Sequence, residues 1–251
     1  MRELIKGDNV KPLFRVVAPV TALVFALSGC SFSASVSVGG DAHKPPKVGE
    51  KADVEKLGND LVEAMKKVKY LKTASKTEMS RDETVETQTV DYEFDYTDPT
   101  HPRGKAIIKD GKGGEIIQIG DGWDFYTKKK GEAKYKKESS KPQEKFDPSE
   151  HYRKLMDQVE SAEYLGTEDV KGKKAYHYKL TSKQKNTSKE GGVQLGVYVP
   201  EEIWLYGDNK FAQFMTTNEY PQLKMKSKTV QTYYDYDKKV TVTPPDPSEV
   251  A

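Results

Sequence analysis

The spacing of apolar residues changes along this chain from a helical period to a strand period. In residues 51–70 they recur at steps of three and four, as on one face of an amphipathic helix. From Leu71 onward they alternate with polar residues, which is typical of strands that bury one face. A second helical pattern covers residues 147–162, where Asp147 suits the N-cap and Pro148 the first helical position.

Turn signals divide the alternating segments into hairpins. Gly120-Asp121-Gly122, Lys171-Gly172-Lys173 and residues 207–210 each predict a tight turn between two strands. The alternation continues into residues 238–245, which we expect to end the sheet. The order of helix, strands, helix and strands predicts an α+β fold. Its sheet would be largely antiparallel, with two or three helices covering one face.

The first thirty residues predict export and a lipid anchor. Basic residues at positions 2, 6, 11 and 15 precede an apolar run at 16–29. The run is shorter than the roughly 20 residues of a membrane-spanning helix and is typical of a secretion signal. It ends in Leu27-Ser28-Gly29-Cys30, which resembles the bacterial lipobox, where the cysteine sulfur receives a diacylglycerol and the chain is cut before it. A small buried thiol is the alternative, but it fits poorly beside the Ser/Gly-rich tract that follows.

These features divide the chain into four parts. We expect a signal peptide at 1–29, the lipidated cysteine and a flexible tether at 30–50, one folded domain at 51–246 and a tail at 247–251. The expected location is the extracytoplasmic face of the cell membrane, where the lipid anchors the protein. Acylation of Cys30, the single cysteine, leaves no thiol for disulfide, nucleophilic or metal chemistry.

Charge and motif content argue against several classes of function. The whole chain has 41 Lys and Arg against 39 Asp and Glu, and removal of the signal peptide leaves 37 of each. A chain that is neutral overall does not fit a general nucleic-acid binder. Its four histidines lie in no catalytic or metal-binding spacing, and the sequence has no glycine-rich phosphate loop. We therefore expect no enzyme, no metal and no cofactor.

Residues 128–145 form a lysine-rich segment with eight lysines and three glutamates. Such a segment can contact anionic lipid head groups, at about 1 kcal/mol for each lysine near the surface. It can also be a solvated hairpin edge whose charges prevent strand pairing. We favour the second interpretation because glutamates interrupt the run.

Two hairpin signatures resemble those of LolA-like proteins, and more closely those of LppX/LprG-type lipoproteins. The first consists of Gly166-Thr167-Glu168, Val170, Gly172 and His177-Tyr178, and the second of Pro200, Trp204 and Asp208. The resemblance covers roughly residues 52–245 and includes the order of signal, lipobox, tether, helix and strands. It implies an unclosed β-barrel, or half-barrel, with helices on its concave side and an apolar cavity for acyl chains.

The resemblance implies a function without covalent chemistry. We expect a lipoprotein that binds or shuttles a lipid or another amphiphile, with the membrane and that lipid as its partners. The alternative is an envelope sensor or interaction module with a protein partner, because LolA-like domains also occur in regulators of envelope stress signalling.

The residues expected to line a cavity are the large apolar side chains of the two helices and of several strands. They are Leu61, Met65, Val68, Leu155, Met156, Ile117, Trp123, Phe125, Trp204, Tyr206, Phe211 and Met215. An enclosed acyl chain would gain about 0.8 kcal/mol for each buried methylene. The same side chains could instead meet and fill a solid core, and the sequence leaves both alternatives open.

Overall fold

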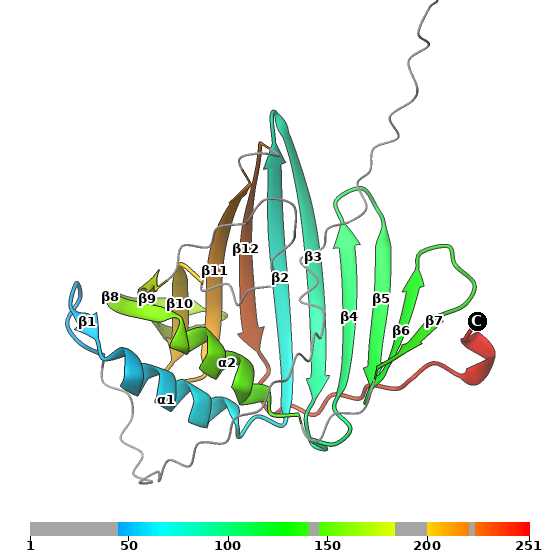
Figure 1. Ribbon diagram of the computed structural model, residues 1–251, viewed down its shortest axis with the longest axis horizontal. Helices are drawn as coiled ribbons and strands as arrows, with labels where there is room; N and C mark the ends of the chain where they lie inside the picture. The colour runs from blue at the N-terminus through cyan, green and yellow to red at the C-terminus, as the bar shows by residue number, and fades with distance from the viewer. Residues whose placement is uncertain (1–44, 141–145, 184–199, 221–223) are drawn as a thin grey trace, which may run out of the picture. The chain divides into compact units, whose positions relative to one another are not determined.

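A computed structural model of the protein describes residues 45–140, 146–183, 200–220 and 224–251. Residues 41–251 form one compact unit. The signal peptide, Cys30 and most of the tether lie outside the described residues. Within the unit the predicted α+β class is confirmed, because two α-helices accompany one open antiparallel sheet (Figure 1).

The sheet has twelve strands among the described residues, and every neighbouring pair is antiparallel. Its order is β1-β8-β9-β10-β11-β12-β2-β3-β4-β5-β6-β7, so β1 and β7 are its two edges and the sheet is not closed. The strands are β1 (Lys51–Ala52), β2 (Tyr70–Arg81), β3 (Thr84–Asp95), β4 (Arg103–Asp110), β5 (Glu115–Asp121), β6 (Asp124–Lys129), β7 (Lys136–Ser139), β8 (Val159–Val170), β9 (Lys173–Ser182), β10 (Glu202–Tyr206), β11 (Phe211–Tyr220) and β12 (Met225–Tyr234).

The predicted hairpin turns are all present. Gly122, Gly172 and Asn209 have positive φ values of 62°, 77° and 61° between β5 and β6, β8 and β9, and β10 and β11. Glycine adopts this conformation without steric cost and asparagine with little, which explains why the turns were visible in the sequence.

Both predicted helices exist, but each is shorter than its pattern. α1 (Val54–Met65) begins after the N-cap Asp53, and α2 (Pro148–Asp157) begins after the N-cap Asp147. The expected extension of the second helix to residue 162 is wrong, because β8 starts at Val159 and pairs with β9. Val159 is buried in the same core as the helices, so its apolar side chain fitted the helical pattern as well as the strand.

The two helices pack against one face of the sheet, here called the helix-bearing face. Their buried side chains share a core with residues of β8 to β12 and with Leu71 of β2. Figure 1 shows the helices at this end of the sheet, with β4 to β7 standing clear of them. In the part of the chain that the structure describes, no helix is long and apolar enough to cross a membrane.

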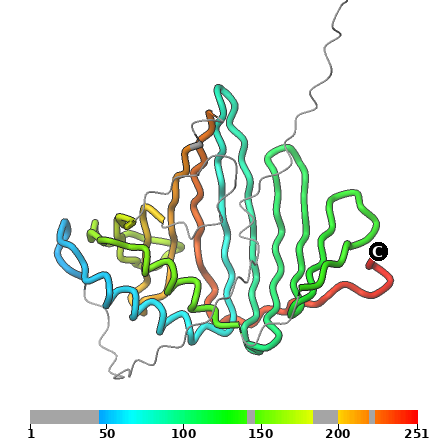
Figure 2. The backbone as a smooth tube through the Cα atoms, in the orientation of Figure 1, coloured from blue at the N-terminus to red at the C-terminus, as the bar shows by residue number. Residues whose placement is uncertain are grey.

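The end of the chain packs against the other face, here called the opposite face. Val240 and Val242 bury their side chains against Ile119 of β5 and Tyr126 of β6. The expectation that residues 238–245 end the sheet is wrong, since they form no strand and their alternation instead buries the two valines. The chain then turns through a 3-10 helix (Pro247–Glu249) toward the strands β6 and β7 (Figure 2).

The last residues bond to the segment that precedes β7. The Tyr135 amide donates to the Glu249 carbonyl at 2.8 Å, and the Ala251 amide donates to the Tyr135 carbonyl at 2.8 Å. Residues 247–251, which we expected to be a tail, are therefore fixed by backbone hydrogen bonds to the folded unit.

Candidate functional site

Six of the predicted cavity residues meet beneath the helices as a packed core. Leu61 and Phe211 have no exposed surface, and Met65 is 1% exposed. The six residues in this single cluster are Leu61, Met65, Val68, Leu155, Met156 and Phe211. Their contacts with one another match the solid-core alternative for the space beneath the helices.

The other six candidates lie elsewhere. Trp204, Tyr206 and Met215 gather in a cluster on the opposite face, because neighbouring strand residues such as Ile203 and Trp204 point to opposite sides. Ile117 packs in the cluster beneath the C-terminal segment. Trp123 lies in the turn together with Gly122, and Phe125 lies against Gly120 on the helix-bearing face. The twelve residues therefore fall into separate groups on the two faces of the sheet.

A second apolar cluster lies on the helix-bearing face beyond the helices. It consists of Val90 on β3 with Ala106 and Ile108 on β4, flanked by Tyr92 and Ile116. Directly paired residues of antiparallel strands share a face, and Val90 pairs with Ile108, which pairs with Ile116. Among the described residues, neither helix contributes a side chain to this cluster. We call these five residues the outer apolar cluster.

An aromatic row along β3 connects the packed core to the outer apolar cluster. The rings of Tyr92 and Phe94 stack at 5.7 Å, those of Phe94 and Tyr96 at 5.5 Å, and Phe146 continues the row 5.3 Å from Tyr96. Gly104 lies beneath Phe94, where a Cβ atom would come within 3.3 Å of the ring. Burial raises the pKa of Tyr96 well above its usual value, so this phenol stays neutral at physiological pH.

Beside the outer apolar cluster, the same face carries hydroxyl and amide side chains without charge. Thr73, Thr77, Gln88 and Ser227 are each less than 10% exposed. We call the whole set the uncharged polar band: Thr73, Ser75, Thr77, Gln88, Thr216, Asn218, Ser227, Thr229 and Gln231. Sequence reasoning missed this band, although threonine, serine and glutamine occupy alternate positions in β2, β3 and β12.

Hydrogen bonds across strands organise part of the uncharged polar band. The hydroxyls of Thr77 and Thr229 lie 2.9 Å apart, and the Gln231 amide donates to the Thr73 hydroxyl at 3.4 Å. The Thr216 hydroxyl is enclosed and has no hydrogen-bond partner among the described residues. An enclosed polar atom without a partner carries a desolvation cost that a ligand could remove by hydrogen bonding.

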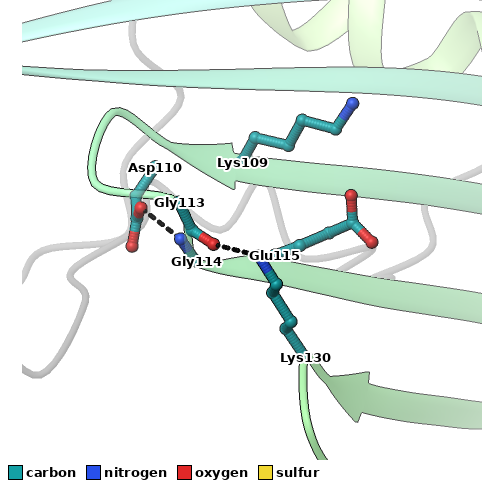
Figure 3. Close-up of a pocket in the computed structure, with 6 residues that line it drawn as sticks. All are labelled: Lys109, Asp110, Gly113, Gly114, Glu115 and Lys130. Carbon is teal, nitrogen blue, oxygen red and sulfur yellow. Dashed lines mark hydrogen bonds between the residues drawn. The ribbon is translucent and has the colours of Figure 1, made fainter.

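A polar pocket of about 280 Å³ lies at the turn between β4 and β5. Figure 3 shows its six lining residues: Lys109, Asp110, Gly113, Gly114, Glu115 and Lys130. The Lys130 ammonium donates to the Gly113 carbonyl at 3.0 Å, and the Gly114 amide donates to the Asp110 carboxylate at 2.7 Å. Because its groups already bond to one another and it has no large apolar side chain, this pocket does not suit an acyl chain.

On the opposite face, His177 of β9 lies between two carboxylates. Its Nδ1 is 2.8 Å from Glu168 of β8, and its Nε2 is 3.0 Å from Glu202 of β10. The imidazole stacks on Trp204 at 4.1 Å, and the Trp204 indole donates to Glu168 at 2.9 Å. The hydrogen bonds from Trp204 and from His177 lower the pKa of Glu168. Glu168, His177 and Trp204 belong to the two hairpin signatures, so the spacing of these signatures reflects a contact between three strands.

The described part of the lysine-rich segment, residues 128–140, has local partners for several of its ammonium groups. Lys136 pairs with Glu132 at 2.9 Å, and Lys137 pairs with Asp124 at 2.9 Å. Lys128 lies over the ring of Tyr135 at 5.0 Å. These contacts match the interpretation as a solvated hairpin edge, because each exposed pair contributes only about 0–1 kcal/mol and leaves the strand edge charged.

Comparisons with known proteins find similarity in solved structures. No protein-family model matches the sequence, and neither does any curated protein. LprF from Mycobacterium bovis is 13% identical with a TM-score of 0.49, covering 76% of this chain and 96% of its own. A LolA superfamily protein from Nitrosomonas europaea is 9% identical with a TM-score of 0.29, covering 77% and 96%.

A third similar structure is a complex. The MucA/MucB structure from Pseudomonas aeruginosa is 15% identical with a TM-score of 0.36, covering 80% of this chain and 61% of that chain. The set includes proteins of the LolA and LprF type, as the resemblance in the sequence predicts. At these identities, the similarities concern the fold alone.

Proposed function

We propose that the protein is a membrane-anchored extracytoplasmic lipoprotein that binds an amphiphilic lipid non-covalently on the helix-bearing face. One observation supports this more than any other. The outer apolar cluster continues the aromatic row of β3 beyond the helices, so the apolar part of this face is larger than the helices cover. A sheet face of this kind suits an elongated apolar ligand.

The energetics of acyl-chain burial fit such a surface. Each methylene removed from water contributes about 0.8 kcal/mol, so eight of them contribute about 6 kcal/mol before the cost of association. The stacked rings of Tyr92, Phe94 and Tyr96 are already ordered by one another and by Gly104. Little side-chain entropy would therefore be lost when a chain lies along them.

The anchor and the location belong to the same proposal. Acylation of Cys30 would hold the domain beside its lipid source, and the residues from 31 onward would serve as the tether. The tether would end before Gly49, whose amide donates to the Tyr164 carbonyl of β8 at 2.8 Å. The names of similar structures, which include a lipoprotein-sorting protein domain from Vibrio parahaemolyticus, agree with a place in the cell envelope. The envelope protein partner expected as the alternative remains an outcome of the test below.

The test is native mass spectrometry of the full chain purified with Cys30→Ser, so that the covalent lipid does not mask a bound one. We expect a co-purifying mass of a lipid. Ile108→Asn should reduce its occupancy at least about tenfold by placing an amide in the outer apolar cluster. The matched control is Ile107→Asn, which alters the same strand on the opposite face.

The thermal midpoints of both variants show whether each one folds. An empty wild-type domain that does not take up added lipid but captures one envelope protein would overturn the proposal in favour of the sensor. If both variants fold and lose lipid equally, the ligand does not bind at the outer apolar cluster.

A further inference from the structure

The nine side chains of the uncharged polar band stand out because the same strands are heavily charged on their other side. The opposite face of β2, β3 and β12 carries Lys72, Lys76, Glu78, Asp91, Glu93, Lys226 and Lys228. Charged residues make up 32% of the sequence. The absence of charge in the uncharged polar band therefore distinguishes it from the opposite face of the same strands.

We propose that this band receives the head group of the bound lipid, and that the head group is uncharged and carries hydroxyl groups. This inference rests on the proposed function and adds the chemical class of the ligand. Threonine and serine hydroxyls both donate and accept, as do the amides of Gln88 and Gln231. They match a hydroxyl-bearing head group, which also needs both kinds of partner.

The position of the band fits the two parts of an amphiphile. Along the β2–β3 pair, Ser75 lies opposite Val90 and Thr73 lies opposite Tyr92. Neighbouring strands are about 4.8 Å apart, so the polar band and the outer apolar cluster adjoin. A lipid with its chain on β3 and β4 would place its polar end on β2 and β12. Next to β12, the Thr216 hydroxyl of β11 has no hydrogen-bond partner in the part of the chain that the structure describes.

A charged head group does not fit the same place. A phosphate or carboxylate shielded from water without a counter-ion costs several kcal/mol, and the band provides no cation. On β2 and β3, the charged side chains facing the same way are Arg81 and Glu86, which lie toward the β2–β3 turn. On β4, Asp110 pairs with Gln88 at the edge of the band, and its negative charge would repel an anionic head group. Arg81 is exposed there, and Glu86 pairs with Lys112.

The experiment compares lipids that share their chains and differ in their heads. Vesicles of phosphatidylcholine carry either dioleoylglycerol or dioleoylphosphatidic acid, and the full chain with Cys30→Ser extracts lipid from them. The extracted lipid is quantified by mass spectrometry. We expect dioleoylglycerol to be taken up at least about tenfold more than the phosphatidic acid. A third arm with a glycosylated dioleoylglycerol separates a glycerol hydroxyl from a sugar as the preferred head.

A charge-introducing variant tests the position. Ser75→Lys places an ammonium in the band and should reduce the preference or reverse it in favour of phosphatidic acid. Ala74→Lys adds the same charge on the opposite face and should leave the preference unchanged.

The outcomes separate the two proposals. If the protein without a substitution in the band takes up phosphatidic acid as strongly as dioleoylglycerol, or more strongly, the head-group inference is overturned and lipid binding is left intact. Uptake of neither lipid, nor of the glycosylated one, would overturn lipid binding itself. The wild-type comparison remains decisive even if the Ser75→Lys variant does not fold.

Discussion

At the scale of single residues, the contact between His177, Glu168, Glu202 and Trp204 links three strands through side chains. The imidazole has a carboxylate at each ring nitrogen and an indole against its face. Its side chain is 10% exposed, whereas that of Glu168 is 53% exposed. The network thus joins a buried histidine to a carboxylate that water still reaches, so its contribution to stability is modest and depends on pH.

We predict that Glu168 makes stability sensitive to acid. The hydrogen bond from Trp204, and after it the one from His177, lowers the pKa of Glu168 in the folded protein. A glutamate in an unfolded chain has a pKa of roughly 4.3. The stabilisation is therefore present above about pH 4.3 and is lost as the pH falls through the folded pKa. Glu168→Gln should cost about 0.5–1 kcal/mol at pH 7 and flatten this dependence.

Urea denaturation between pH 3 and 7 measures the effect. Glu160→Gln changes an exposed glutamate at the start of the same strand and should leave the pH profile as in the wild type. A steep acid dependence that persists in Glu168→Gln would contradict the assignment.

At the scale of elements, the two helices pack closely at Gly58. A Cβ atom at this position of α1 would lie 3.1 Å from the Cβ of Met156 on α2. The glycine therefore determines how closely the two helices approach each other. Their spacing in turn determines how the helices cover strands β8 to β12. A larger residue would separate the pair, because a packed core yields little to added volume.

We predict that Gly58→Leu destabilises the protein by about 2 kcal/mol through this overpacking. Asn59→Leu, which places the same side chain on the exposed side of α1, should change stability by less than about 0.5 kcal/mol. Chemical denaturation of both variants tests this. Similar stabilities would show that the helices can move apart without cost.

The elements also show what could be predicted from sequence and why the rest could not. Period and capping residues identified both helices, and positive-φ positions such as Gly122 identified the turns, since these signals are local. The ends of α2 and the path of residues 238–245 depend on partners distant in the chain. Apolarity alone does not indicate which face a strand residue occupies, because only the register separates Ile203 in the core from Trp204 on the opposite face.

At the scale of the whole molecule, the proposed lipid anchor would decide where the domain works. We predict that Cys30→Ser moves the protein from the membrane pellet to the soluble fraction, because acyl chains on the sulfur contribute about 0.8 kcal/mol per buried methylene. Ser31→Ala, the neighbouring control, should remain in the pellet. Fractionation of cells expressing each full chain gives the measurement. A Cys30→Ser protein that still sediments with membranes would contradict the lipid anchor.

The strand order has a consequence for how the molecule is assembled. β12 lies between β11 and β2, and the paired hydroxyls of Thr77 and Thr229 are 152 positions apart. The strands β2 to β7 can form one meander by pairing with their neighbours in sequence, and so can the strands β8 to β11. The two meanders join into one sheet only when β12 pairs with both β11 and β2. Such long-range closure is slow, so the folding chain passes through a stage in which β2 and β11 are two additional unpaired strand edges. Pairing of these unpaired strand edges with other chains, which leads to aggregation, is a hazard while the protein folds.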